Sequence, residues 1–206
     1  MLWILTVITI SYLIGSIPTA YIFGRLLKGI DIRTHGSGNV GATNALRVLG
    51  KKAGISVLVL DVLKGVFAVL LVQAFVGRVR LDPLIFRLLA GISCICGHNW
   101  TVFLQFKGGK GMATTLGVLI GIAASTPGLG IILIMLLLTW LAIFVIFRIV
   151  SLASVIAALA LPAYALLFRQ PTAIVITAFI LSAFVIFRHR PNLSRLAKGK
   201  EPRLKF

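Results

Sequence analysis

Three polar segments interrupt an otherwise hydrophobic chain, and each combines small or hydrogen-bonding residues with Lys, Arg or His. They are DIRTHGSGNVGATNALR (Asp31–Arg47), GHNWTVFLQFKGGKGMAT (Gly97–Thr114) and HRPNLSRLAKGKE (His189–Glu201). Glycine backbone N–H groups and cationic side chains are the groups with which proteins bind phosphates and other anions. Each segment adjoins a hydrophobic stretch long enough to enter a bilayer. We therefore expect the three segments to build one anion site, of the kind an enzyme needs.

The clearest anion-binding pattern is the run Lys107-Gly108-Gly109-Lys110-Gly111. Glycines let the backbone approach a ligand closely, and consecutive N–H groups form a concave anion site. A helix that begins at Met112 would add the positive potential of its N-terminus. The run is not a nucleotide-binding P-loop, because no Gly lies four residues ahead of a Gly-Lys-Ser/Thr unit and no strand precedes it. A plain flexible turn is the alternative interpretation.

The segment Gly36–Asn44 contains three glycines and four hydrogen-bonding side chains, and Arg47 follows three residues later. So many small polar groups cannot stabilise a helix by packing, but they can line a pocket at membrane depth. The Arg47 guanidinium can hold a phosphate or carboxylate through two hydrogen bonds. Two alternatives stay open: Arg47 as a cation that snorkels to the interface, and Ser37 as the cap of a local turn.

In the third segment His189 and Asn192 are three residues apart, so a helix would place them on one face. Pro191 between them favours the start of a helix over its interior. Histidine is the side chain whose ordinary pKa lies nearest neutral pH, so His189 is a candidate base, although a lone His among Arg residues is also typical of a membrane interface. The three histidines have no adjacent carboxylates, so no metal site is expected. No other cofactor is expected either.

Acidic residues are scarce, and Asp61 is the one that falls clearly inside a hydrophobic span. An ionisable residue in a membrane is a candidate functional site. Here an ion pair with Lys64, three residues further on, is the favoured interpretation. No pair of carboxylates is placed for acid–base work, and no Gly-x-Ser-x-Gly elbow occurs. A covalent Ser-His-Asp mechanism is therefore poorly supported.

The composition indicates an integral membrane protein. Hydrophobic residues make up 59% of the 206 residues and charged ones 12%, against about one half and one quarter in soluble domains. We expect one membrane domain over residues 1–206. No Lys or Arg precedes Leu2–Phe23, and this stretch exceeds the signal-peptide hydrophobic region of about 7–15 residues, so a retained helix is predicted. Cys94 and Cys96 are expected to pack between helices and to form neither a disulfide nor a metal site.

The hydrophobic stretches predict an all-α integral membrane fold with seven transmembrane helices. The predicted spans are Leu2–Phe23, Ala53–Val76, Leu84–Leu104, Met112–Ser125, Gly128–Phe147, Val150–Phe168 and Thr172–Phe187. The fourth is short for a span, and the turn Thr126-Pro127-Gly128 follows it. Pro162 falls within the sixth, where we expect a kink and no break.

The distribution of Lys and Arg predicts the orientation in the membrane. With the N-terminus outside and the C-terminus cytoplasmic, sixteen of the 21 cations lie on the cytoplasmic side and three outside, while Lys64 and Arg87 fall within spans. All three polar segments are then cytoplasmic. The net charge of +17 also suits anionic lipid head groups as partners. Nucleic acid is not an expected partner, because the cations border the membrane and no soluble base-reading module is present.

In these motifs the chain resembles the bacterial acyl-phosphate:glycerol-3-phosphate acyltransferases of the PlsY type, which are integral membrane enzymes of phospholipid synthesis. The resemblance covers nearly the whole chain and rests on the three polar segments, on DVLKG at Asp61–Gly65 and on VSLAS at Val150–Ser154. Several long motifs in one order are far more specific than a single glycine-rich loop. The His-x-x-x-x-Asp motif of other acyltransferases is absent, because no Asp lies five residues after any of the three histidines.

The resemblance implies a seven-helix fold in the bacterial inner membrane, with the active site at the cytoplasmic face. It also implies the reaction, which is the committed acylation step of phospholipid synthesis. An acyl group passes from acyl phosphate to the 1-hydroxyl of glycerol 3-phosphate, and lysophosphatidic acid and inorganic phosphate are released. The resemblance implies as well that neither acyl-CoA nor acyl carrier protein serves as donor, and we expect no acyl-enzyme.

The resemblance further implies roles for individual residues. Ser37 and Arg47 would hold the donor phosphate, and Arg47 would also contact glycerol 3-phosphate. The predicted catalytic residues are Ser37, Arg47, Lys110, His189 and Asn192. The predicted substrate-binding residues are Gly38, Asn39, Asn44, Lys107, Gly108, Gly109, Gly111, Ser151 and Ser154, of which Ser151 is the weaker of the two serines. Glu201 would anchor the C-terminal tail.

Two functional questions stay open at this point. A transporter of an organic phosphate would also need a cationic pocket, but we find no internal repeat and the polar segments lie at one face. A lipid-binding scaffold would leave the glycine-rich loops unexplained. The general base is either a substrate phosphate or His189. The sequence leaves the acyl-chain preference and the oligomeric state undecided, and a monomer is compatible with it.

Overall fold

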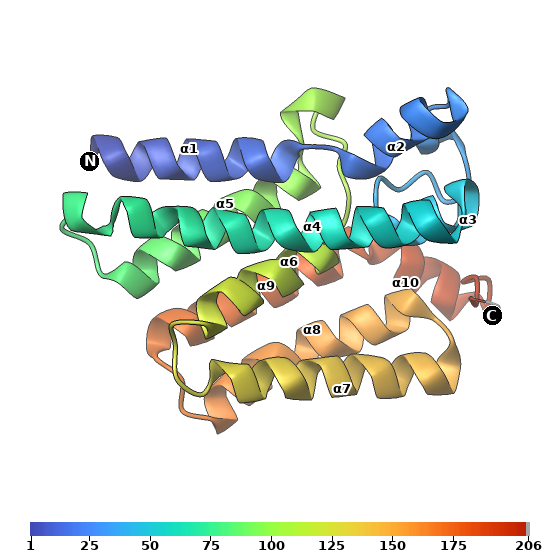
Figure 1. The fold of residues 1–206 in the computed structure, drawn as a ribbon. Helices are drawn as coiled ribbons and strands as arrows, with labels where there is room; N and C mark the ends of the chain where they lie inside the picture. Colours follow the sequence, from blue (N-terminus) through green and yellow to red (C-terminus); the bar gives the residue numbers. More distant parts are fainter. Residues whose placement is uncertain (205–206) are drawn as a thin grey trace. The chain divides into compact units, whose positions relative to one another are not determined.

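The computed structural model describes residues 1–204, and its regular structure over this range is entirely helical (Figure 1). Lys205, one of the cations assigned above to the cytoplasmic side, lies outside the described residues. The chain divides into two compact units, residues Met1–Ile122 and Ala123–Phe206, and we describe each by itself. The expectation of one membrane domain over the whole chain stays a prediction.

The first unit contains six α-helices joined by short 3₁₀ turns. The helices are α1 (Leu2–Ser16), α2 (Thr19–Lys28), α3 (Ala42–Leu49), α4 (Lys51–Leu71), α5 (Pro83–Asn99) and α6 (Met112–Ala123). The 3₁₀ turns are Ile32–Thr34, Val72–Ala74, Val76–Arg78 and Val102–Leu104. Helix α1 packs against both α5 and α4, and α3 packs against the beginning of α4 (Figure 1).

Local sequence explains where these helices begin and end. Pro18 has no N–H to donate, and α1 ends just before it while α2 begins just after. Asp82 caps α5, because its carboxylate accepts hydrogen bonds from the N–H groups of Leu84 (2.8 Å) and Ile85 (3.0 Å). Gly111 has φ = 77°, a left-handed conformation that suits glycine, and α6 begins at the next residue.

Glycines bring α4 and α6 into unusually close contact. A Cβ atom at Gly117 would collide with the carbonyl group of Val62, and one at Gly65 would collide with that of Thr114. Small residues allow helix backbones to approach in this way, which is typical of helix pairs in membranes. Because α6 starts immediately after the Lys107–Gly111 run, this contact fixes the position of that run relative to α4.

The second unit contains α7 (Leu129–Phe147), α8 (Val150–Leu167), α9 (Thr172–Arg188) and α10 (Arg190–Ala197). Helix α8 packs against both α7 and α9, and α10 packs against α8 and α9. Thr139 and Tyr164 join α7 to α8 through their hydroxyl groups, which lie 2.8 Å apart. Helix α8 continues through Pro162, as predicted. Helix α10 starts beside Pro191, which confirms the predicted helix start.

Among the described residues, four helical segments are long and hydrophobic enough to cross a membrane, and the number rises to five if α9 and α10, which are bent by 58°, count as one span. The four are Leu2–Lys28, Lys51–Ala74, Leu129–Phe147 and Val150–Leu167. Within residues 1–204, α5 with 17 residues and α6 with 12 are shorter than these segments. Seven spans and the orientation therefore stay predictions.

Two predicted spans differ from the helices in a way that matters for the site. Leu2–Phe23 is divided at Ile17-Pro18 into α1 and α2, because the proline interrupts the helical hydrogen bonds. Leu84–Leu104 is helical only to Asn99, after which the chain turns towards the Lys107–Gly111 run.

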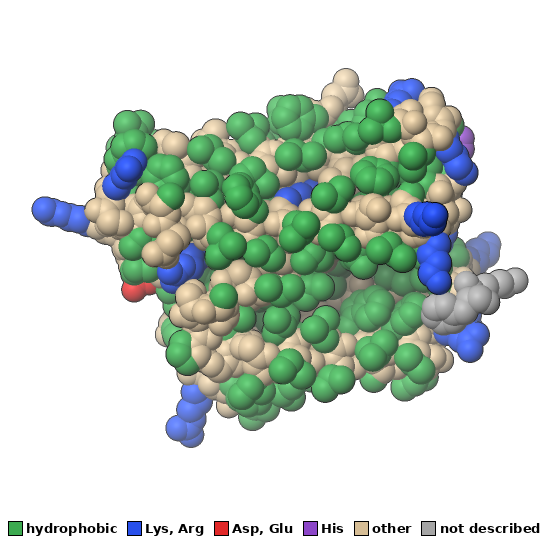
Figure 2. All heavy atoms as spheres, in the orientation of Figure 1, with side chains coloured by type: hydrophobic (Ala, Val, Ile, Leu, Met, Phe, Trp, Pro, Cys, Tyr) green, Lys and Arg blue, Asp and Glu red, His purple; other side chains and the backbone are tan. Residues whose placement is uncertain are grey.

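Hydrophobic side chains cover the exposed faces of α4 and α7, while Lys and Arg side chains lie mostly near the ends of helices (Figure 2). On α4 the exposed side chains include Leu63 and Phe67, and on α7 they include Ile134 and Leu138. A soluble protein rarely exposes continuous hydrophobic surface of this kind, whereas lipid tails cover it at low cost.

The close contact of α4 with α6 predicts that Gly117→Ala destabilises the protein. The added methyl group would force the two backbones apart, at a cost of about 1–3 kcal/mol. The measurement is the thermal unfolding midpoint of the purified protein in one detergent. Gly130→Ala on α7 is the control, because a Cβ there has open space and alanine favours a helix. Equal midpoints for the two variants would contradict the role given to Gly117.

Candidate active site

The loop before α3 is held in shape by the buried side chain of Asn44. Its Oδ1 accepts a hydrogen bond from the N–H of Ser37 (2.8 Å), and its Nδ2 donates to the carbonyls of His35 (3.1 Å) and Ile32 (3.3 Å). Gly36 and Gly38 in this loop have φ values of 60° and 70°, in the region that favours glycine. Asn44, predicted to bind substrate, thus uses its carboxamide to fix the backbone that presents the exposed Ser37.

Arg47 lies in the last turn of α3, and its side chain is exposed. It lies one helical turn beyond Asn44, so its backbone is positioned by the same short helix. Arg33, which is nearby in sequence, forms an ion pair: its guanidinium donates a hydrogen bond to the Asp31 carboxylate at 2.7 Å. This hydrogen bond holds the pKa of the Asp31 carboxyl at about 2. The charge of Arg33 is therefore largely neutralised within the chain.

The Lys107–Gly111 run folds back onto the end of α5. The N–H of Gly109 donates to the carbonyl of His98 (3.0 Å), and the N–H of Gly108 donates to the carbonyl of Asn99 (3.2 Å). A Cβ atom at either glycine would collide with these two residues of α5. The two glycines are thus required for close packing against α5.

These hydrogen bonds change the expected geometry of the anion cradle. The N–H groups of Gly108 and Gly109 are directed to α5, whereas the sequence predicted that they would face an anion. The first N–H groups of α6 have no partner within their own helix and are donors that an anion can use. The N-terminus of α6 also provides positive potential.

One hydrophobic cluster lies beneath both polar segments of the first unit. Val40 and Ala45 belong to the first segment, and Leu104 belongs to the second, three residues before Lys107. All three side chains are buried in a single cluster with Ala20, Ile32 and Val57. The structure therefore brings the first and second polar segments onto a common core, while the single anion site built from all three segments stays a prediction.

In the second unit three side chains donate hydrogen bonds to a single carboxylate. Glu201 accepts hydrogen bonds from Ser151 (2.8 Å), Asn192 (2.5 Å) and Arg195 (2.8 Å). The tail makes one more contact, in which the N–H of Leu204 donates to the carbonyl of Arg148 at 2.9 Å. Glu201 thus fixes the tail, in agreement with the anchoring role expected from the sequence. It also fixes two of the predicted site residues, Ser151 from the substrate-binding set and Asn192 from the catalytic set.

His189 lies between α9 and α10, and its side chain is buried. Its Nδ1 is 2.8 Å from the carbonyl of Val185, which can only accept a hydrogen bond. Nδ1 therefore carries a proton, and Nε2 is the atom that can accept one when the ring is neutral. Ser154 on α8 is also buried, and its hydroxyl accepts a hydrogen bond from the indole Nε1 of Trp140 at 3.3 Å.

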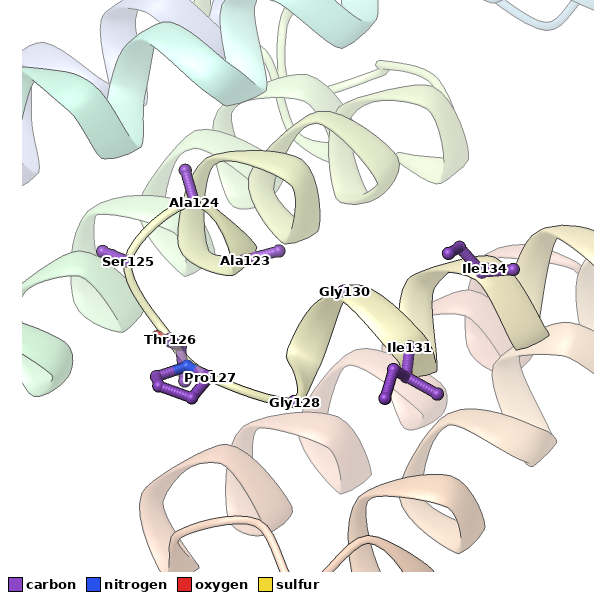
Figure 3. A pocket seen from close by; sticks show the side chains of 9 residues that line it. All are labelled: Ala123, Ala124, Ser125, Thr126, Pro127, Gly128, Gly130, Ile131 and Ile134. Atoms are coloured by element: carbon purple, nitrogen blue, oxygen red, sulfur yellow. The ribbon is translucent and has the colours of Figure 1, made fainter.

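The second unit also contains a pocket with a volume of about 630 Å³, around the turn that leads into α7 (Figure 3). Its lining comprises residues 123–128, 130, 131 and 134. The size suits a small ligand. None of the lining residues carries a charge, and none is a predicted site residue, so this pocket is not the expected anion site. Within residues 1–204, no group of three His, Cys, Asp or Glu side chains is placed to hold a metal ion.

The predicted residues thus fall into two sets. The first unit holds Ser37, Gly38, Asn39, Asn44, Arg47 and Lys107–Gly111, and the second holds Ser151, Ser154, His189 and Asn192. Two contacts were not predicted from the sequence: Ser151 and Asn192 share Glu201 as a partner, and His98 and Asn99 support the glycine-rich run. The contact of His98 and Asn99 with the run could have been inferred from the sequence, because this polar dipeptide ends a hydrophobic stretch close to the run.

Comparison with known proteins places these features in a family. The model of the glycerol-3-phosphate acyltransferase family matches residues 5–199 of the chain. The chain belongs to this family. It is 47% identical to glycerol-3-phosphate acyltransferase 2 of Moorella thermoacetica and 41% identical to the glycerol-3-phosphate acyltransferase of Chlorobium phaeobacteroides. The first alignment covers 98% of both chains, and the second covers 100% of this chain and 98% of the relative.

Two solved structures of PlsY, an integral membrane glycerol 3-phosphate acyltransferase, also resemble the chain. The glycerol 3-phosphate form has a TM-score of 0.86 and 37% identity, with 98% of this chain and 96% of that chain covered. The lysophosphatidic acid form has a TM-score of 0.83 and 36% identity, with coverage of 98% and 95%. Together with its long hydrophobic helices, this likeness shows that the acyltransferase is a multi-pass membrane protein.

The contacts of Glu201 predict a pH-dependent contribution to stability. Burial raises its pKa, but hydrogen bonds from Asn192, Ser151 and Arg195 outweigh burial and hold the pKa below the ordinary value. Because the folded pKa is the lower one, the stabilisation is present above the unfolded pKa of about 4.3 and is lost as the pH falls through the folded pKa.

We expect Glu201→Gln to lower the thermal unfolding midpoint near neutral pH and to flatten its dependence on pH below about pH 4.5. The measurement is the unfolding midpoint in detergent between about pH 3 and pH 7, for wild type and variant. Asp82→Asn is the control, because it also removes a carboxylate, one that caps the start of α5. Parallel curves for wild type and Glu201→Gln would contradict the assignment.

Proposed function

We propose that the protein is an acyl-phosphate-dependent glycerol-3-phosphate acyltransferase of a bacterial inner membrane, acting as one membrane domain over residues 1–206. It would transfer a fatty acyl group to the 1-hydroxyl of glycerol 3-phosphate and release lysophosphatidic acid and inorganic phosphate. The observation that carries this proposal is the near full-length likeness to PlsY, whose two structures are a glycerol 3-phosphate form and a lysophosphatidic acid form. Seven spans, an external N-terminus and a cytoplasmic active site belong to the same proposal.

The first unit is suited to hold the phosphate of the donor. Arg47 is exposed and can bind a phosphate bidentately, and the Ser37 hydroxyl lies on the loop that Asn44 fixes. Lys110 lies two residues before the N-terminus of α6, where positive potential favours an anion. In this proposal Gly38, Asn39 and Asn44 shape the first loop, and Gly108 and Gly109 shape the second. Lys107 and Gly111 complete the second loop.

The second unit is suited to orient glycerol 3-phosphate. The Ser154 hydroxyl accepts from Trp140 and still has a hydrogen to donate to an oxygen of the substrate. His189 presents Nε2 because Val185 occupies its Nδ1. Asn192 is oriented by its hydrogen bond to Glu201. Ser151 donates to that same carboxylate, so we assign it a weaker role in binding.

The chemistry of an acyl phosphate fits a chain so poor in acids. The 1-hydroxyl oxygen attacks the carbonyl carbon, and the bond from that carbon to the phosphate oxygen then breaks. Phosphate is already a good leaving group, so no acyl-enzyme is needed. The hydroxyl proton passes to a phosphate oxygen of a substrate, with His189 orienting the nucleophile. Lysine, serine and backbone N–H groups would stabilise the developing oxyanion, and alignment of the reactants supplies much of the rate enhancement.

Two polyanionic substrates must meet in this reaction, so their mutual repulsion has to be offset. The chain provides 21 Lys and Arg residues against four acids, which supplies the necessary positive field. Membrane lipids are the expected surroundings, and no further cofactor has a role in these steps.

The first prediction from this proposal is the donor specificity of the purified protein in lipid. With palmitoyl phosphate and glycerol 3-phosphate, we expect release of inorganic phosphate that depends on glycerol 3-phosphate, together with lysophosphatidic acid. Palmitoyl-CoA is the control donor and should give no product. Turnover with palmitoyl-CoA would refute the donor assignment. If no chemistry occurs but vesicles take up unchanged glycerol 3-phosphate, the protein is a transporter.

The second prediction concerns the proton acceptor. If a substrate phosphate is the base, His189→Gln should keep kcat within about tenfold of wild type across the pH range, because only orientation is disturbed. A loss of about 10²–10⁴-fold would instead identify His189 as the general base. His189→Asn is the matched variant, because its amide can still donate to the carbonyl of Val185. His35→Gln, at an exposed histidine, controls for loss of an imidazole elsewhere.

A further inference from the structure

A buried polar cluster in the first unit has no role in the proposed reaction. Asp61 on α4 is 1% exposed, and its Oδ1 lies 2.9 Å from Nζ of Lys64 and 2.7 Å from the hydroxyl of Thr19. Nδ1 of His98 on α5 lies 3.7 Å from the same oxygen. Ionisable groups are costly to bury in a hydrophobic helix bundle, so a cluster of this kind calls for a function.

The cluster is anchored at the interruption between α1 and α2. Nζ of Lys64 donates to the carbonyl of Ile17 (3.1 Å), which is the residue before Pro18. Thr19, the first residue of α2, donates its hydroxyl to Asp61. Lys64 and Thr19 therefore fix the position of the Asp61 carboxylate from two sides. An ion pair alone would satisfy Asp61, yet His98 also faces it.

The opposite side of the His98 ring lies under the glycine-rich run. A Cβ atom at Gly109 would meet Nε2 of His98 first and then the carbon atoms next to it. The backbone carbonyl of His98 accepts a hydrogen bond from the N–H of Gly109, and the carbonyl of Asn99 accepts one from the N–H of Gly108. His98 thus has Nδ1 towards Asp61 and Nε2 towards the run that ends at Gly111.

We propose that Asp61 and His98 are positioning residues for the Lys107–Gly111 run. Asp61 orients the imidazole, and the imidazole supports Gly109 from below, so that Lys110 and the N-terminus of α6 stay where they bind phosphate. The inference rests on the proposed function to the extent that it takes this run as the site of the donor phosphate. Asp61 acts through His98, and neither residue is required to touch the substrate.

This arrangement predicts an effect on one substrate. If the run holds the donor phosphate, displacing it should weaken the binding of acyl phosphate and leave glycerol 3-phosphate unaffected. A cluster that only stabilises the helix bundle would lower the unfolding midpoint without this selectivity. The ratio of the two KM values therefore separates positioning from a merely structural role.

The test uses Asp61→Asn, His98→Asn and the double variant in the full-length protein in lipid. Asp61→Asn keeps the shape and the partner of Thr19 but removes the charge, while His98→Asn keeps a donor towards Asp61 and removes the ring beneath Gly109. We expect each single variant to raise KM for palmitoyl phosphate about tenfold, with KM for glycerol 3-phosphate unchanged. The double variant should show no further increase, because both changes act through one contact.

Ser93→Ala is the matched control. It removes another polar contact of α5, the hydrogen bond from Ser93 to the carbonyl of Ile8 (2.8 Å). It should lower the unfolding midpoint and leave both KM values at wild-type levels. If Asp61→Asn and His98→Asn behave like Ser93→Ala, the cluster is structural and the inference is overturned. Additive effects in the double variant would overturn the link between Asp61 and His98.

Two further measurements apply if His98→Asn does not fold or if the wild type shows no turnover. If His98→Asn does not fold, His98→Gln decides, because it retains a nitrogen beneath Gly109 but loses the one that faces Asp61. A rise in donor KM of about threefold or more supports the inference, and an unchanged KM overturns it.

If the wild type shows no turnover, the proposed function fails, and inorganic phosphate becomes the probe. Phosphate that raises the unfolding midpoint of the wild type but not of His98→Asn supports the positioning role without the enzyme activity. If phosphate has no effect on the wild type, or the same effect on both proteins, the inference fails as well.

Discussion

The hydrogen bonds from Gly108 and Gly109 to the last carbonyls of α5 determine how the first unit presents its cations. The carbonyls at the end of a helix have no partner within that helix, and a buried one is costly to leave unsatisfied. Here the run after α5 supplies the donors, and only glycine can approach closely enough to do so. The same contact turns the chain back, so that α6 starts beside α5 and packs against α4 through Gly65 and Gly117.

The few acids of the chain each have a defined partner. Asp31 is bound by Arg33, Asp61 by Lys64, and Glu201 by Arg195, while Asp82 caps the N–H groups at the start of α5. With four acids against 21 Lys and Arg residues, most cations have no carboxylate in the chain to neutralise them. A field of this sign would destabilise an ordinary soluble domain by self-repulsion. It suits a protein whose surroundings and substrates are anionic phosphates and lipid head groups.

Sequence patterns predicted the all-helical fold, because about 20 apolar residues bounded by glycine, proline and charge leave little choice in a membrane. The ends of helices were harder to predict. At the division of the first span, Lys64, 47 residues away from Ile17, donates to the carbonyl of Ile17. No local pattern contains that information.

The candidate site shows the same limit. The glycines in the Lys107–Gly111 run were predicted to bind substrate, but the N–H groups of Gly108 and Gly109 point to α5 and not to an anion. The sequence shows that a backbone must approach something closely, and it does not show whether that partner is a ligand or the end of α5. Likewise, the proximity of Ser151, Asn192 and Arg195 to one carboxylate arises from the return of the tail to α8 and α10. Such long-range contacts require the folded chain.

The side chains proposed for the chemistry share one physical property, which is that other parts of their own unit hold them in place. The carbonyl of Val185 fixes the ring of His189, Glu201 fixes Asn192, and Asn44 fixes the loop that carries Ser37. Orientation before the substrate arrives lowers the entropy that must be lost in the transition state. When the leaving group is already good, alignment and charge stabilisation are the main contributions left for a protein to make. A chain with many fixed polar groups and no poised pair of carboxylates is therefore better suited to acyl transfer from an activated donor than to hydrolysis of a stable ester.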